Sequence, residues 1–308
     1  MRRAANAVSM AMNAKVIRIG DRRQDALARP TGTPVVEPGA ERVLRALANR
    51  FASVKPRGVR GDIECYIARD VRGDVVQLLA LPARRSADAG ARKMFQLEAD
   101  AASKLAHVNI VGTGAPEEID GVLFYVIEHK DAARTLRELV DNNGWLDVRS
   151  AVQIADQIAS ALSYAHQMGV LHLRVQPESV LVEPDGWVTV ADFGLETKHG
   201  AERLLAPRVP YASPEQTMRG AVDHRSDLYS LGAVLYEMLT DRTPFDSNDE
   251  DYVRQRQVAF HPAPPHLISP DAPEPVSNVV MRLLERDPAK RFASAAAFQA
   301  ALDRAVND

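Results

Sequence analysis

The apolar residues of this 308-residue chain change their spacing near Leu136, and this change constrains the fold more than any other feature. Before Leu136, runs of apolar residues bounded by turn residues, as at Arg72-Gly73-Asp74, indicate strands. The predicted strands cover residues 65–71, 75–81, 110–111 and 122–127, and one predicted helix covers residues 91–105. Beyond Leu136 the spacing is helical, and the predicted helices cover residues 148–168, 227–239, 276–284 and 294–306. A small strand-rich lobe with one long helix, followed by a larger helical lobe, is an α+β arrangement.

The overall composition argues against several classes of partner. The chain is 46% hydrophobic, which suffices for a sizeable core. A net charge of -3 and a pI near 6.3 do not provide the clustered excess of Lys and Arg that nucleic-acid binding needs, so we expect no nucleic-acid partner. We expect no membrane partner either, because no run of about 18 apolar residues occurs. The single cysteine, Cys65, can form neither an intramolecular disulfide nor a zinc cage, which favours the reducing cytoplasm.

The N-terminal segment differs in composition from the rest of the chain. Residues 1–37 contain seven Lys or Arg and three Asp or Glu, a net charge of +4. Lys15 and several polar residues interrupt its apolar stretch, which disfavours a signal peptide. We predict a disordered basic tail over residues 1–45, with a partner-docking arm as the alternative. Apolar residues at helical spacing also predict a short helix over residues 38–50 that leads into the folded domain.

Several motifs occur in a fixed order in the second half of the chain. They are Asp192-Phe193-Gly194, Ser213-Pro214-Glu215, the segment DHRSDLYSLGAVLYEMLTDRTPF with Asp227 and Gly232, and ERDPAKRF with Arg291. From about residue 50 to its end the chain resembles a bacterial serine/threonine protein kinase domain. The resemblance implies an N-lobe at residues 46–128 and a C-lobe at residues 129–308. It also implies structural roles for His172, Phe193, Gly194, Glu215, Asp227 and Arg291, with Arg291 paired to Glu215.

The segment HLRVQPESVL matches the catalytic loop of that family but lacks its reacting residues. Arg174 stands at the position of the catalytic aspartate, Gln176 at that of the loop lysine, and Ser179 at that of the metal-binding asparagine. A guanidinium stays protonated at physiological pH, so Arg174 cannot accept the proton of a substrate hydroxyl. The remaining candidate metal ligands are Asp192 and Ser179, and the hydroxyl is a weaker ligand than the amide it replaces.

The phosphate-binding residues of the family are altered as well. The strand lysine of the family corresponds to Leu79. The helix glutamate, Glu98, follows 19 residues later. In the glycine-rich loop Gly58 is kept, whereas Arg60 and Ile63 replace the second and third glycines, so the cover over the phosphates is degraded. An ordinary hairpin turn is the alternative interpretation of this loop.

Other positions of the nucleotide site keep a counterpart in this sequence. Gln77 replaces a small alanine beside the adenine and would partly fill the pocket. The hinge corresponds to residues 127–130, and its bonds to a nucleotide would use backbone atoms. The resemblance therefore implies nucleotide-binding remnants at Gly58, Gln77, Glu98, Ile127, Glu128, Lys130 and Leu181.

Two acidic residues of the reaction site survive without their usual partners. Asp192 without nucleotide would lack its metal, and Glu98 lacks its lysine, so we expect each to find another cation. We hypothesise that Arg174 pairs with Asp192 and substitutes for Mg²⁺; the alternative is that Arg174 points to solvent.

The segment between Gly194 and Pro210 lacks the features of a phosphorylation switch. Its one hydroxyl is Thr197, Leu173 replaces the arginine that would bind a phosphate, and Arg208 replaces the threonine before Tyr211. We therefore expect no ordering of this segment by phosphorylation.

These observations favour a catalytically deficient pseudokinase that acts as a scaffold or regulator of signalling proteins, with an active kinase as one candidate partner. A second hypothesis is a Ser/Thr kinase of low activity that recruits Glu178 or Asp192 as its base. A third is a sensor that binds ATP without transfer. The first predicts no cofactor, whereas the others require ATP, with Mg²⁺ for transfer. The chain ends at Asp308 after the last predicted helix, so we expect no sensor domain or membrane anchor.

Overall fold

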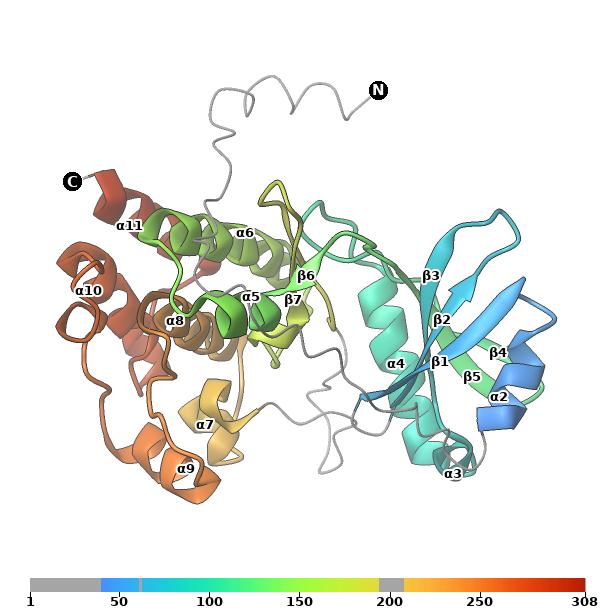
Figure 1. Ribbon diagram of the computed structural model, residues 1–308. Coiled ribbons are helices and arrows are strands. Elements are labelled where there is room, and N and C mark those ends of the chain that lie inside the picture. The colour runs from blue at the N-terminus through green and yellow to red at the C-terminus, as the bar shows by residue number, and fades with distance from the viewer. Residues whose placement is uncertain (1–39, 61–62, 194–207, 308) are drawn as a thin grey trace.

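The computed structural model describes residues 40–60, 63–193 and 208–307. It consists of a small lobe built on a β-sheet and a larger lobe built mainly of helices (Figure 1). The α+β two-lobed arrangement predicted from the sequence is confirmed.

The small lobe contains a five-stranded antiparallel sheet in the order β1-β2-β3-β5-β4. The strands are β1 (Ser53–Arg60), β2 (Ile63–Arg69), β3 (Val75–Ala80), β4 (Glu117–Ile119) and β5 (Val122–Glu128). The sequence did not predict β1 or β4. The strand predicted at residues 110–111 is wrong, because Ile110 forms only an isolated bridge to Val190.

One face of the sheet packs on the long helix of this lobe, α4 (Ala89–Ser103). The strand register places Leu79 between Cys65 and Tyr125, and all three join Phe95 of α4 in one apolar cluster. Helix α4 begins after Asp88, whose carboxylate accepts hydrogen bonds from two backbone N–H groups of the first turn. The short helix α3 (Ala83–Ser86) connects β3 to α4.

The other face of the sheet is covered by α2 (Ala40–Leu47) (Figure 1). Val43 and Leu47 of this helix share an apolar cluster with Tyr66, Leu78 and Phe124 of the sheet. Residues 40–45, which the predicted boundary placed in the tail, are therefore helical. The remainder of the predicted tail lies outside the described residues.

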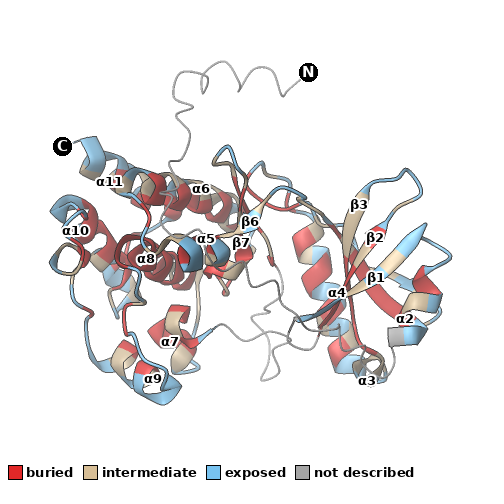
Figure 2. Cartoon of the chain, viewed as in Figure 1, coloured by how far each residue is buried: buried red, intermediate tan, exposed pale blue. Residues whose placement is uncertain are grey.

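The larger lobe is organised around a central buried helix, α8 (His224–Thr240), in which residues 226–240 are all buried (Figure 2). A Cβ on Gly232 would lie 2.6 Å from the Cβ of Leu283, so glycine permits the close contact between α8 and the helix that ends at Leu283. The other helices are α5 (Leu136–Asn143), α6 (Val148–Gln167), α7 (Pro214–Thr217), α9 (Glu250–Ala259), α10 (Glu274–Leu283) and α11 (Ala295–Asn307). A small sheet of β6 (Arg134–Thr135), β7 (Val180–Val182) and β8 (Val188–Val190) lies on the side that faces the small lobe.

Candidate functional site

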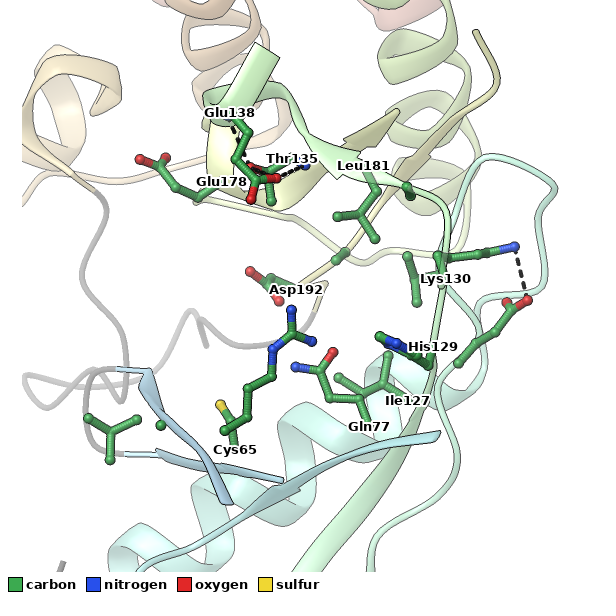
Figure 3. Close-up of a pocket in the computed structure, with 17 residues that line it drawn as sticks. Cys65, Gln77, Ile127, His129, Lys130, Thr135, Glu138, Glu178, Leu181 and Asp192 are labelled. Atoms are coloured by element: carbon green, nitrogen blue, oxygen red, sulfur yellow. Dashed lines mark hydrogen bonds and ion pairs between the residues drawn. The ribbon is translucent and has the colours of Figure 1, made fainter. Parts of the chain in front are cut away.

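A pocket of about 350 Å³, here called the cleft, opens between the sheet of the small lobe and the β7–β8 region (Figure 3). Its lining includes seven residues that the sequence placed at the site: Gly58, Gln77, Ile127, Glu128, Lys130, Leu181 and Asp192. Arg57 and Val111 also line it, and sequence reasoning missed both. The available signal for Arg57 was its position directly before the retained Gly58.

The segment that carries the catalytic-loop motif is held by Asp227 of α8, a fully buried residue. Its oxygens accept hydrogen bonds from the backbone N–H groups of His172 (2.9 Å) and Leu173 (2.5 Å), and the ring of His166 lies 2.8 Å away. The same contacts hold Leu173 at a φ of 57°, which is unusual for a residue with a Cβ. The segment is thus fixed by its backbone, whichever side chains it carries.

The ring of His172 connects this loop to the Asp192-Phe193 segment. Its Nε2 lies 2.9 Å from the carbonyl oxygen of Ala191, and its ring meets that of Phe193 edge to face. Burial lowers the pKa of His172, so the imidazole is neutral at pH 7. Gly194 and Thr197 lie outside the described residues.

Arg174, at the position of the base, points to Asp192 rather than to solvent. Its Nη1 lies 3.6 Å from Oδ2 of Asp192, with the side chains 12% and 2% exposed. This is the pair hypothesised from the sequence. It places a permanent positive charge beside the carboxylate that would otherwise bind a metal.

Ser179, the second candidate metal ligand, is fully buried and holds a turn of its own loop. Its hydroxyl donates to the carbonyl oxygen of Gln176 (2.8 Å) and accepts from the N–H of the same residue (3.2 Å). The side chain of Gln176 also has a structural contact: its Oε1 accepts a hydrogen bond from the backbone N–H of Arg208 (3.4 Å).

Asp192 and Ser179 are a poor fit for a divalent metal ion, because the guanidinium of Arg174 stands beside Oδ2 of Asp192 and the hydroxyl of Ser179 holds a backbone turn. The described residues also contain no cluster of three or more His, Cys, Asp or Glu side chains that could hold a metal.

The position on β3 where the family carries its lysine is occupied here by an apolar, buried residue. Leu79 is fully buried among Cys65, Phe95 and Tyr125. Glu98 is 1% exposed, and neither of its carboxylate oxygens has a hydrogen-bond partner among the described residues. Burial raises the pKa of Glu98 to about 8, so this carboxyl is mainly protonated at pH 7. The expectation that Glu98 would find another cation is wrong for the part of the chain that the structure describes, because this glutamate stays neutral instead.

Glu178 lines the cleft where an alternative base was hypothesised. Two cations hold it: Nε of Arg137 lies 3.4 Å from its Oε1, and Arg208 makes a direct ion pair with the same oxygen. Arg137 also pairs with Glu237 at 2.9 Å and donates a hydrogen bond to Tyr211. Both hypothesised bases, Glu178 and Asp192, are therefore paired with arginines.

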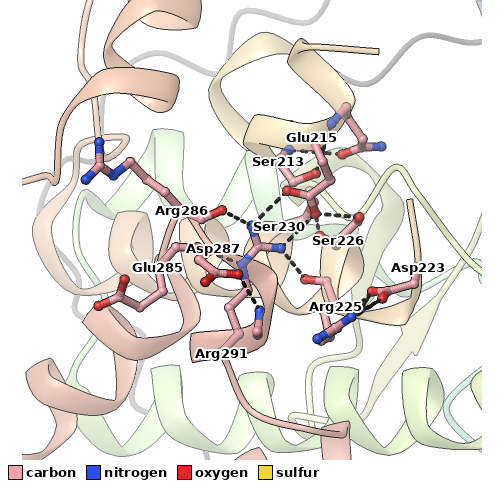
Figure 4. Close-up of polar contacts among 12 residues, drawn as sticks. Ser213, Glu215, Asp223, Arg225, Ser226, Ser230, Glu285, Arg286, Asp287 and Arg291 are labelled. Atoms are coloured by element: carbon pink, nitrogen blue, oxygen red, sulfur yellow. Dashed lines mark hydrogen bonds and ion pairs between the residues drawn. The ribbon is translucent and has the colours of Figure 1, made fainter. Parts of the chain in front are cut away.

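A second polar cluster, remote from the cleft, holds the larger lobe together (Figure 4). Arg291 is 2% exposed, and its guanidinium donates two hydrogen bonds of 2.8 Å to the two carboxylate oxygens of Glu215. It also donates to the carbonyl oxygens of Arg225 (2.8 Å) and Glu285 (2.7 Å). Burial would raise the pKa of Glu215, but the hydrogen bonds from Arg291 outweigh this effect and lower it. The pair predicted from the sequence is thus formed in the described part of the chain.

Comparison with known proteins shows the family. The protein kinase domain family matches residues 69–302. The chain belongs to the protein kinase family. Serine/threonine-protein kinase PrkC of Bacillus subtilis is 30% identical over 269 residues, which are 85% of this chain and 41% of PrkC. PknB of Mycolicibacterium smegmatis is 33% identical over 269 residues, which are 84% of this chain and 43% of PknB.

Solved kinase domains confirm the fold of this family member. The crystal structure of the PknI kinase domain of Mycobacterium tuberculosis superimposes with a TM-score of 0.67 at 26% identity, covering 84% of this chain and 98% of that domain. The chain spans only about two fifths of the length of PrkC and PknB. Among the described residues, no helix is both long enough and apolar enough to cross a membrane.

Proposed function

We propose that this protein is a catalytically deficient member of the kinase family that regulates or scaffolds other signalling proteins. The observation that carries the proposal is the contact between Arg174 and Asp192, in which the residue at the base position forms an ion pair with the residue at the metal position. Phosphoryl transfer in this fold depends on a base, a metal and a phosphate-binding lysine. The base and lysine positions hold Arg174 and Leu79, whereas the metal position keeps Asp192 but places it beside Arg174.

Each replaced residue removes a different contribution to phosphoryl transfer. Arg174 cannot accept a proton, and a positioned general base contributes roughly 10²- to 10⁴-fold to rate. Leu79 offers no charge to a phosphate. Glu178, the remaining carboxylate near the loop, is held by two arginines and would have to break both contacts to act as a base.

A non-catalytic role leaves surface contacts as the means of action. The rigid catalytic-loop segment and the buried pair of Arg291 with Glu215 would maintain the kinase shape without turnover. We propose other signalling proteins as partners, including an active kinase, and a cytoplasmic location.

Radiolabelled phosphate transfer from ATP tests this proposal. We expect incorporation into Ser/Thr peptides, with Mg²⁺ or Mn²⁺, to be equally low for the wild type and Asp192→Ala, because Asp192 is already paired with Arg174 and no base stands beside it among the described residues. The matched control is Asp185→Ala, which removes an exposed carboxylate from the turn between β7 and β8. Incorporation that persists in the wild type and the control but disappears in Asp192→Ala would contradict the proposal and restore the interpretation as a kinase.

A second candidate function, nucleotide binding without transfer, is favoured by the cleft itself. The cleft remains open beside the hinge residues Ile127, Glu128 and Lys130 although Gln77 enters it. Its lining combines apolar side chains with many polar and charged ones, and a concave pocket is the usual kind of site for a small ligand.

A further inference from the structure

Arg57 is an exposed cation that lines the cleft. Its side chain makes no hydrogen bond or ion pair with any residue that the structure describes. The other basic residues of the lining have partners: Nζ of Lys130 lies 2.9 Å from Oε1 of Glu128, and Nε2 of His129 lies 3.0 Å from Oδ1 of Asp131. Among the lining residues that the structure describes, Arg57 is therefore the permanent cation that remains available to an anionic ligand.

A β-bulge directs Arg57 to the cleft. Pro56 of β1 stands opposite Tyr66, and Gly58 stands opposite Cys65, so Arg57 is the extra residue between the two pairs. Tyr66 belongs to the face that α2 covers, whereas Cys65 lines the cleft. Because strand residues alternate between faces, the residue after Pro56 faces the cleft, and the bulge keeps Gly58 on that side as well.

Glycine is what permits this bulge. Gly58 has a φ of 141°, a backbone conformation that residues with a Cβ rarely adopt. Bulges are frequent beside active sites, where they redirect a side chain. The retained Gly58 and Arg57, which has no hydrogen-bond or ion-pair partner among the described residues, thus form one local arrangement.

The surroundings of Arg57 define the kind of ligand. Apolar side chains line the cleft and would accept a flat aromatic ring: Cys65, Val111, Ile127, Leu181 and Ala191. A guanidinium binds phosphate through two parallel hydrogen bonds. We propose that the cleft binds a nucleotide, with Arg57 as the residue that binds its phosphates, and without a divalent metal ion. This inference rests on the second candidate function and extends it by naming the cation and excluding the metal.

The exclusion of metal follows from the contacts of the two candidate ligands. A divalent ion at Asp192 would have to displace Arg174, and Ser179 would have to leave the turn that it holds. Mg²⁺ in solution would also occupy the phosphate oxygens that Arg57 needs. We therefore expect the nucleotide to bind at least as tightly in EDTA as in Mg²⁺.

The experiment measures the affinity of the full chain for ATP and for adenosine by isothermal titration, each with EDTA and with MgCl₂. Arg57→Ala is expected to weaken ATP binding at least about tenfold in EDTA, since a hydrogen bond to a charged group is lost, and to leave adenosine binding unchanged. Arg57→Lys should retain part of the affinity for ATP, because lysine keeps the positive charge but cannot form the two parallel hydrogen bonds of a guanidinium. The matched control is Lys55→Ala, which removes an exposed cation of the same strand that lies outside the cleft lining.

The outcomes separate this inference from the proposed function. ATP binding that requires Mg²⁺, that is equal in Arg57→Ala and the wild type, or that is undetectable would overturn the inference. None of these results would affect the proposal of a non-catalytic regulator, which phosphate transfer decides. Because Arg57 is exposed, the melting temperature of Arg57→Ala without ligand should equal that of the wild type, which checks that the variant is folded.

Discussion

Replacing Arg291 by methionine is expected to lower the free energy of unfolding by about 3–5 kcal/mol, because the change leaves a buried carboxylate without its cation. Glu215 would keep neutral donors such as the hydroxyl of Ser226, which donates to its Oε1 at 2.6 Å. The carbonyl oxygens of Arg225 and Glu285 would lose their hydrogen bonds as well. Urea-induced unfolding of the Arg291→Met variant measures the effect.

A matched control exists in the same cluster. Arg225 pairs with Asp223 at 2.6 Å, but the two side chains are 31% and 41% exposed (Figure 4). Arg225→Met should therefore change the free energy of unfolding by less than about 1 kcal/mol, because water replaces the lost partner. If Arg291→Met were as mild as Arg225→Met, the buried pair would not be what holds this part of the lobe together.

A double variant, Arg291→Met with Glu215→Met, tests why Arg291→Met should lower the free energy of unfolding. Removing both charges abolishes the buried unpaired carboxylate, so the double variant should be more stable than Arg291→Met alone. A double variant that is less stable would show that packing of the guanidinium stem and its contacts with carbonyl oxygens dominate over the charge pair.

The long helices could be predicted from sequence because their apolar faces repeat within one segment. The helix predicted over residues 148–168 forms as Val148–Gln167. The start of α8 was placed three residues late, because its cap, Asp223, precedes the apolar pattern and accepts a hydrogen bond from the backbone of Arg225. The approximate position of a helix thus follows from periodicity, and its first residue follows from a cap.

The strands at the edges of the sheet could not be predicted, because their pairing is not local. The segment SVKPRGVR of β1 contains Pro, Gly and charges and lacks apolar alternation, yet it pairs along β2. The short apolar run at Ile110 predicted a strand, but Ile110 only forms an isolated bridge with Val190, 80 residues away in the chain.

At the site, too, side-chain positions that depend on contacts with distant segments could not be predicted from the sequence. Spacing within the kinase motif sufficed to hypothesise the contact of Arg174 with Asp192. The orientation of Arg57 depends on one extra residue in β1 relative to β2, which no pattern in the sequence reveals. For Glu98, the motif predicted a missing lysine but not its consequence, because only the structure shows that burial favours the protonated acid.

That protonation makes stability depend on pH in a definite direction. The ordinary pKa of a glutamate is 4.5, and burial raises the pKa of Glu98 in the folded protein to about 8. Between these two values the folded state keeps a proton that the unfolded state has lost. The contribution of Glu98 to the free energy of unfolding therefore decreases by about 1.4 kcal/mol for each pH unit from 4.5 to 8, and is constant outside that window.

Glu98→Gln should remove this dependence, because the amide has nearly the same shape and no proton to lose. The difference in free energy of unfolding between the variant and the wild type should shift in favour of the variant by roughly 3 kcal/mol between pH 4.5 and pH 7. Taking the difference between the two pH values cancels the contribution of the buried amide itself. Asp100→Asn, which replaces an exposed carboxylate on α4, is the matched control and should follow the wild-type profile. Parallel profiles of Glu98→Gln and the wild type over this range would show that Glu98 is ionised in the folded protein, and would mean that a cation reaches it.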